Sequence, residues 1–251
     1  MTPLIEKALA AATEQLKEVD QLIETMRPPL VSPGRLQCAL FLTIAEQFES
    51  VVRLANAGLI THSAILVRSM LEAAADLRLL GTEAEYVERM RYNRASGEKR
   101  FYEQLLASER LPDDVREWID LRQPALLDHH APLHEQFRRS KRTQADTFVA
   151  ADMTYVVGYY TMLCSFAHND ITALAFRHQG IGSMTYKAAI PDEISFVIVQ
   201  LASTALMLAT EQMRGIAKFA DDQFESRFNS MNAAFATLLR LRPAGADGPP
   251  Y

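Results

Sequence analysis

The sequence predicts an all-α protein, a single bundle of about seven or eight helices with a long, heptad-patterned helix at its N-terminus. Apolar residues recur at intervals of three and four along most of the 251 residues, which is the period of amphipathic helices. Proline or glycine stands at most of the breaks between these stretches. We expect one domain over residues 1–242, with a loop-rich insertion at 124–146 and a disordered tail at 243–251.

The first helix is expected to begin at Pro3, with Thr2 as its cap. Its apolar residues alternate in spacing between four and three over three heptads: Ile5, Leu9, Ala12, Leu16, Val19, Ile23 and Met26. Such a seam packs along one long, straight partner. The partner is either another helix of the same chain or a second copy, so a homodimer through this helix is one of two predictions.

Three further helices are expected before residue 106. One begins at Pro33 and carries an apolar stripe up to Gly58, and the next covers roughly residues 61–80. The third of them follows Gly81 and extends to about Leu105.

Two prolines shape the prediction for the middle of the chain. A short helix after Pro112 should end at Pro124, because a proline inside a helix removes one hydrogen bond and clashes with the preceding turn. Pro132 interrupts the chain again. We therefore expect residues 124–146 to form a long loop with one or two helical turns.

The C-terminal part should contain three more helices. A long apolar helix runs from near Thr147 through His168, and residues 183–190 form either an irregular excursion or a short hairpin strand. Pro191 opens the most apolar helix, whose run from 194 to 209 is shorter than the ~20 apolar residues that a membrane span needs. It is predicted to be a core helix, without a membrane partner, and a final amphipathic helix follows from 224 to 238.

The composition favours a reducing, cytoplasmic location. Cys38 and Cys164 both lie in apolar helical stretches, where a free thiol behaves as a small hydrophobic group. The first residues show no basic segment followed by an apolar stretch, the pattern of a secretory signal. The net charge of −5 argues against a broad nucleic-acid surface.

One polar line interrupts the apolar helix expected at 61–80. Arg68, Glu72 and Asp76 are four residues apart and fall on one narrow arc. They are either a solvated face with weak i, i+4 pairs or a half of a polar pocket inside the bundle. Burial would demand mutual pairing and further hydrogen bonds, because an unpaired buried charge costs several kcal/mol.

A second polar pair, Ser165 and His168, lies three residues apart on a later helix. A histidine beside a serine can orient or deprotonate it, although catalysis also needs a third group and an oxyanion hole. The other interpretation is a core histidine satisfied by Ser165 or by Glu72. Arg68, Glu72, Ser165 and His168 are thus the candidate site, catalytic or ligand-binding.

The chain resembles a family at these residues. The helix with Leu66-Val67-Arg68-Ser69-Met70-Leu71-Glu72-Ala73-Ala74, and the later helix in which Tyr159-Tyr160 lead to Ser165 and His168, are similar to a group of bacterial all-helical proteins known only as a domain of unknown function. The resemblance covers about residues 35–217. It implies that the four candidate residues are shared positions, and it implies no activity.

That group is in turn distantly similar to helical ribonuclease and nucleotide-binding domains of prokaryotic defence systems. Their usual pattern places an arginine and a histidine on one helix, and the nearest spacing here joins Arg122 to His129, with Pro124 between them. A rigid helix should not carry the pattern across that proline. The resemblance implies a nuclease only if Arg68 and His168 meet in space.

Three histidines lie close together in the expected loop. His129, His130 and His134, with two nearby carboxylates, are ligand types for zinc or another transition metal. The alternative is a polar loop that happens to be rich in histidine. No other cofactor is indicated, since the chain has no dinucleotide-binding or P-loop glycine pattern.

A basic run follows the histidines: Arg138, Arg139, Lys141 and Arg142. It is either a solvated surface or an electrostatic contact for nucleic acid. Two functions remain open. The first is a binding or regulatory module around the polar pocket, and the second is a ribonuclease-like enzyme in which His168 transfers protons and Arg68 stabilises phosphate charge.

Overall fold

A computed structural model of the chain describes residues 2–168, 170–180, 183–186, 190–220 and 223–241. Ten α-helices, two short 3-10 helices and one two-stranded hairpin make up the regular structure of these residues. The all-α prediction is therefore confirmed. The chain divides into two compact units: residues 1–79 together with 144–251, and residues 80–143. The predicted disordered tail, 243–251, lies outside the described residues.

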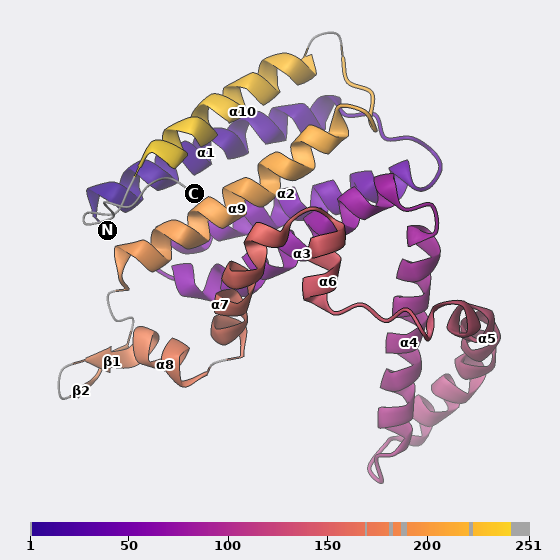
Figure 1. Cartoon of the computed structure of the whole chain (residues 1–251). Helices are drawn as coiled ribbons and strands as arrows, with labels where there is room; N and C mark the ends of the chain where they lie inside the picture. The colour runs from indigo at the N-terminus through magenta and orange to yellow at the C-terminus, as the bar shows by residue number, and fades with distance from the viewer. Residues whose placement is uncertain (1, 169, 181–182, 187–189, 221–222, 242–251) are drawn as a thin grey trace. The chain divides into compact units, whose positions relative to one another are not determined.

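The first unit contains most of the elements of the chain (Figure 1). Its helices are α1 (Pro3–Thr25), α2 (Gly34–Asn56), η1 (Ile60–Ser63), α3 (Ala64–Thr82, whose last turn crosses the boundary), α6 (Gln144–Ala150), η2 (Thr154–Val156), α7 (Val157–Ala167), α8 (Ile171–His178), α9 (Asp192–Met213) and α10 (Gln223–Arg240). Strands β1 (Gln179–Gly180) and β2 (Ser183–Met184) form an antiparallel hairpin. The second unit contains α4 (Tyr86–Leu106) and α5 (Asp113–Phe137).

The apolar face of α1 is covered by helices of its own chain. Helix α1 packs against α10, α9 and α2, and Figure 1 shows α1, α9 and α10 running side by side. Polar contacts hold both ends and the middle of α1. At the start, Thr2 Oγ1 donates to Asp192 at 2.5 Å, and along the helix Glu18 pairs with Arg227 at 3.0 Å. Just after its end, the backbone of Arg27 pairs with that of Lys218. The heptad seam thus has a partner within the chain. A homodimer stays a prediction, but this face is not open for it.

Helix α9 is the central core helix of the first unit. It begins after Pro191 as predicted, and most of its side chains are buried against α1, α2 and α10. By length and composition alone it could cross a membrane, yet 67% of its apolar window is buried inside the protein. Such burial is what a core helix requires.

Helix α3 is held deep in the first unit by polar contacts from α2. Gln37 Nε2 donates to the backbone oxygen of Leu77 at 3.1 Å, and Gln47 Nε2 donates to Ser69 Oγ at 3.0 Å. Val67, Met70 and Leu71 are fully buried. Because both ends of its apolar face are fixed in this way, the polar line of α3 has a defined orientation.

The structure overturns the prediction of a loop-rich insertion at 124–146. Helix α5 continues through both Pro124 and Pro132 to Phe137. Both prolines are exposed, as are Asp120 and Asp128, whose carbonyls lose their helical donors. Water can satisfy those carbonyls, so the prolines cost less here than they would in a buried helix.

The long helix expected from Thr147 to His168 is also broken. Helix α6 ends at Ala150, and Asp152 adopts a left-handed backbone with φ of 53° before η2 and α7 begin. Asp152 pairs with Arg78 of α3 at 3.2 Å. Aspartate tolerates the left-handed region better than most residues, so a break is possible without glycine. Residues 183–184 form a strand, one of the two alternatives predicted for that segment.

Candidate functional site

The polar line on α3 contains the centre of the candidate site. Arg68 and Glu72 lie one turn apart on a helix whose other faces are largely buried. The Arg68 side chain is 28% exposed and that of Glu72 is 35% exposed. They belong neither to a freely solvated face nor to a sealed core. Both of the predicted alternatives were too extreme.

A tyrosine from α7 completes the cluster. Arg68 Nε donates to Glu72 Oε1 at 3.1 Å and to the Tyr160 hydroxyl at 3.0 Å. The Tyr160 hydroxyl in turn donates to Glu72 Oε1 at 2.5 Å. The guanidinium carbon of Arg68 lies 5.2 Å from the centre of the Tyr160 ring, within cation–π range. We name Arg68, Glu72 and Tyr160 the α3–α7 cluster.

The electrostatics of the α3–α7 cluster keep Arg68 charged and Tyr160 neutral at neutral pH. The hydrogen bond to Tyr160 raises the pKa of the Arg68 guanidinium, and Glu72 acts in the same direction. Burial and the hydrogen bond to Glu72 raise the pKa of Tyr160 to about 12. At neutral pH the cluster therefore contains one cation, one anion and one neutral hydroxyl, and its net charge is zero.

Three polar atoms of the α3–α7 cluster remain open. Within the described part of the chain, Nη1 and Nη2 of Arg68 and Oε2 of Glu72 make no hydrogen bond. None of them is among the fully buried atoms without a partner. They are therefore reachable from solvent. A guanidinium whose Nε edge is fixed and whose outer edge is open has the geometry that binds carboxylate or phosphate.

Ser165 and His168 do not join the α3–α7 cluster. Asp170 caps α8 by accepting from the backbone N–H of Ala173 at 2.9 Å, and its own backbone N–H donates to the Ser165 carbonyl oxygen at 3.2 Å. The Ser165 side chain, followed by the backbone at the start of α8, lowers the pKa of the Asp170 carboxyl by stabilising its charged form. His168 is exposed at the end of α7. No contact links either residue to Arg68 or Glu72 in the part of the chain that the structure describes.

The register of α7 explains which residues face α3. Tyr160 and Cys164 are four apart and share a face, and the Cys164 side chain interacts electrostatically with Arg68. Ser165 is one residue further and is rotated by about 100° away. Tyr160 was missed as a site residue, although the Tyr159-Tyr160 pair was part of the family resemblance. No local pattern distinguishes Tyr160 from Tyr159, because the face of α7 that meets α3 depends on how the two helices pack.

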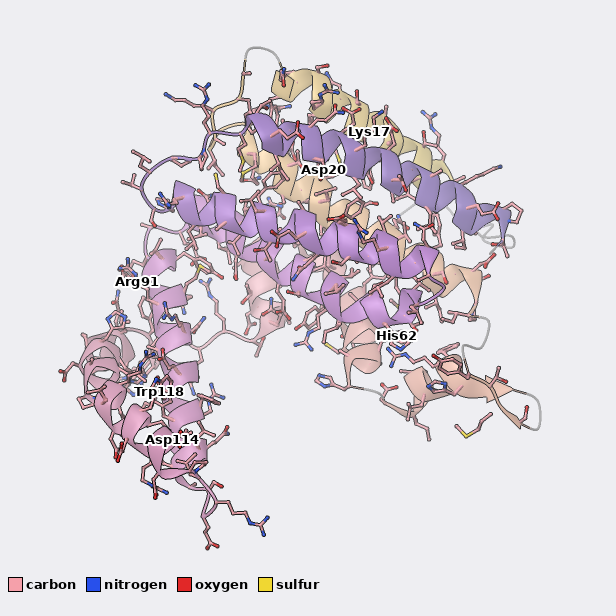
Figure 2. All side chains as sticks on the ribbon, turned by 180° about the vertical axis from the view of Figure 1, so that it is seen from behind. Lys17, Asp20, His62, Arg91, Asp114 and Trp118 are labelled. Carbon is pink, nitrogen blue, oxygen red and sulfur yellow. The ribbon has the colours of Figure 1, made fainter. Side chains whose placement is uncertain are left out.

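Arg177 is a half-buried arginine whose contacts were not predicted from the sequence. From α8 it donates to the Thr61 hydroxyl at 3.3 Å, and to the backbone oxygens of Thr61 and Phe166 at 3.0 and 3.2 Å. It thereby ties α8 to η1 and to α7. Burial, followed by the positive charge of Arg177, lowers the pKa of the neighbouring His62, which is labelled in Figure 2.

The three candidate metal ligands lie on α5 and are not arranged around a common point. His130 is buried, and its ring stacks on that of His134 with centroids 5.2 Å apart, whereas His129 is exposed. Among the described residues, no group of three or more His, Cys, Asp or Glu side chains could hold a metal ion. The predicted metal site is therefore not formed by His129, His130 and His134.

His130 and His134 instead contribute to an aromatic stack in the second unit. Tyr92 of α4 packs on His130, His134 and Phe137, with centroids 5.7, 6.1 and 5.9 Å away. Ser96 Oγ hydrogen bonds with His130 Nε2 at 3.1 Å, and the guanidinium of Arg89 lies 4.9 Å from the Phe137 ring. We name Tyr92, His130, His134 and Phe137 the α4–α5 stack. It holds the helical hairpin together.

The basic run is partly neutralised within the second unit. Arg142 Nη1 contacts both carboxylate oxygens of Glu83, at 2.8 and 3.0 Å, and Arg138 pairs with Glu135 at 3.1 Å. For Arg139 and Lys141 no ion pair appears among the described residues. Two of the four positive charges of the run are therefore paired with carboxylates. Binding of nucleic acid stays an untested prediction.

A comparison with known proteins places the chain in a family. The profile of a family described as "Family of unknown function (DUF5677)" matches residues 36–182, which is more than half of the chain and includes all the residues of the α3–α7 cluster and the α4–α5 stack. No curated protein and no solved structure matches the chain. The predicted resemblance to a domain of unknown function is confirmed, whereas the distant similarity to defence-system domains is not shown. The chain belongs to the DUF5677 family of unknown function.

Proposed function

We propose that the chain is a cytoplasmic helical binding module, in which the α3–α7 cluster holds a small anionic ligand. The observation that carries the proposal is the open outer edge of Arg68, whose Nε is fixed by Glu72 and Tyr160. An anion at Nη1 and Nη2 would complete the donor set of the guanidinium.

The arrangement reduces the cost of binding. A free arginine loses rotamer freedom when it grips a ligand, at about 0.5–1.5 kcal/mol for a side chain of this kind. Here the hydrogen bonds at Nε and the contact with the Tyr160 ring already order the side chain. The remaining exposure of Arg68 gives a ligand access to the outer edge.

The enzyme hypothesis has less support. It requires Arg68 and His168 to act on one substrate, and no contact joins them among the described residues. His168 also makes no side-chain hydrogen bond to an orienting partner in that part of the chain. We therefore place binding ahead of catalysis.

Ligand-dependent stabilisation tests the proposal. A ligand that binds only the folded protein stabilises it by RT ln(1 + [L]/Kd), which is about 2.7 kcal/mol at a hundredfold excess over Kd. We expect inorganic phosphate or acetate to raise the melting temperature of the wild type, and Arg68→Gln to abolish this increase. Arg68→Lys should retain part of it, because lysine keeps the charge without the two-pronged edge.

Arg78→Gln is a matched control for Arg68→Gln. Arg78 lies on the same helix, its side chain is 29% exposed, and it also pairs with a carboxylate, that of Asp152. The control variant should retain the response to phosphate and acetate. If the response of Arg68→Gln equals that of the wild type, the binding proposal is wrong.

A further inference from the structure

The α3–α7 cluster offers a negative acceptor beside its positive donor. Glu72 uses Oε1 for both of its hydrogen bonds and leaves Oε2 open, while Arg68 leaves Nη1 and Nη2 open. Arg68 Nε and Glu72 Oε1 are 3.1 Å apart. Nη1 and Nη2 are bonded to the same carbon as Nε, and Oε2 is bonded to the same carbon as Oε1. The open groups of opposite charge are therefore close enough for one small molecule to contact both.

This pairing discriminates between classes of anion. A simple anion on Arg68 also meets the charge of Glu72, and like charges at short range oppose binding. A simple anion such as acetate or phosphate therefore binds more weakly than a ligand that also presents a positive charge to Glu72.

We infer that the ligand of the α3–α7 cluster is a small zwitterion, with a carboxylate bound by the outer edge of Arg68 and an ammonium group bound by Oε2 of Glu72. The inference rests on the proposed function and narrows it from small anions to amino-carboxylates. An ammonium group donates up to three hydrogen bonds and would satisfy the open carboxylate oxygen. The two charges of the ligand then match two fixed charges of opposite sign.

Three probes of similar size separate the contributions of the two charges. Glycine carries both charges, acetate carries only the carboxylate, and methylammonium carries only the cation. A charge-assisted hydrogen bond to Glu72 should make glycine bind roughly tenfold more tightly than acetate. Lengthening the spacer, with β-alanine and 4-aminobutyrate, tests how far apart the two binding groups lie.

Calorimetric titration of the full chain with each probe gives the comparison. Glu72→Gln keeps the shape of the side chain and an acceptor for Arg68 and Tyr160, but it removes the negative charge. We expect Glu72→Gln to lose the preference for the zwitterions and to bind acetate at least as well as the wild type does. Circular dichroism and the melting temperature of each variant verify that it is folded.

The outcomes distinguish this inference from the proposed function. If acetate or phosphate binds through Arg68 as tightly as every zwitterion does, the inference is wrong and the anion site stands. If methylammonium binds as tightly as the zwitterions, the inference is also wrong, because the cation alone then suffices. If none of the probes binds, or if all bind Arg68→Gln unchanged, both the inference and the proposed function are wrong.

Discussion

The α3–α7 cluster of the first unit and the α4–α5 stack of the second are each built around a tyrosine, and the two tyrosines have different roles. The Tyr160 hydroxyl lies between two formal charges, 2.5 Å from Glu72 and 3.0 Å from Arg68. Tyr92 mainly contributes its ring, and its hydroxyl has only a long, 3.4 Å contact with His134. A tyrosine bonded to charges orders a polar site, whereas a tyrosine stacked on rings stabilises a fold. The following substitutions test this difference.

Removing the Tyr92 ring should have the largest effect. Tyr92 is 6% exposed and packs on three rings, so Tyr92→Ala should lower the free energy of unfolding of the hairpin by about 3 kcal/mol, through lost contacts and the cavity left behind. The fluorescence of Trp118, the only tryptophan and labelled in Figure 2, reports the change. Trp118 lies on α5 and packs edge-on against Tyr102, with ring centroids 5.6 Å apart.

Tyr155→Ala is the control for this substitution. Tyr155 is 55% exposed, so its loss should change stability by no more than about 0.5 kcal/mol. Equal effects of the two substitutions in urea unfolding would show that the α4–α5 stack does not hold the hairpin.

Removing the Tyr160 hydroxyl should have a smaller effect on stability and a distinct pH signature. Tyr160→Phe loses a hydrogen bond to a carboxylate and should cost about 1.5 kcal/mol. The raised pKa means that the unfolded chain releases this proton first, near pH 10, and the folded protein only near pH 12. The contribution is therefore complete below pH 10 and is lost as the pH rises to about 12.

Chemical denaturation at pH 8 and at increasing alkaline pH measures this difference. Tyr159→Phe, at the adjacent and more exposed position, serves as the control and should leave the alkaline profile unchanged. An unchanged profile in Tyr160→Phe as well would contradict the role of the hydroxyl.

Acid should lower the stability that the α4–α5 stack contributes, by less than either tyrosine substitution does. Burial, then the charges of His134 and Lys99, lower the pKa of His130 below its ordinary 6.5. A lowered histidine pKa means that the unfolded chain binds the proton more readily, so the contribution is complete above pH 6.5 and is lost as the pH falls through the folded-state value. Trp118 fluorescence during thermal unfolding at pH 7.5 and 5 should show a lower transition temperature in acid.

His130→Gln should reduce this acid sensitivity, and His129→Gln, at an exposed position, should not. An acid sensitivity that survives in His130→Gln would assign the effect to other groups.

The smallest effect is expected from the basic run. Arg142→Ala breaks the contact with Glu83, in which both side chains are 29% exposed, and should cost up to about 1 kcal/mol. Arg139→Ala should stay within about 0.5 kcal/mol, since no ion pair of Arg139 occurs among the described residues. Thermal unfolding in 50 mM and 500 mM salt distinguishes them, because screening should reduce the Arg142 effect only.

Local rules predicted half of the candidate site. The spacing of four residues places Arg68 and Glu72 together on any helix, but the apolar context of α3 left a solvated face and a buried pocket as equal alternatives. The same rule also places Ser165 and His168 on one side of a helix. It could not reveal that α7 turns Tyr160 and Cys164 toward α3, because the rotation of α7 depends on the break at Asp152 and on the packing that follows it.

The prolines of α5 show where a local rule fails. Pro124 and Pro132 indicated a loop, and the penalty behind that rule is real. It is offset here because both prolines are exposed and the opposite side of α5 packs Ile119, Leu133 and Phe137 into the hairpin. The histidines therefore lie on a helix, whereas the basic run follows the end of α5 at Phe137, in the connection to α6.

The helical class, the starts of α1 and α9 at their prolines, and the pairing of Arg68 with Glu72 could be predicted from the amino-acid sequence, because each depends on residues within a few turns of one another. Three other features required the packed fold: that α1 finds its partner within the chain, that residues 80–143 form a separate hairpin unit, and that Tyr160 joins Arg68 and Glu72. These contacts join residues up to 209 positions apart, as in the pair of Arg227 with Glu18. Such contacts depend on how whole helices pack, which no local pattern encodes.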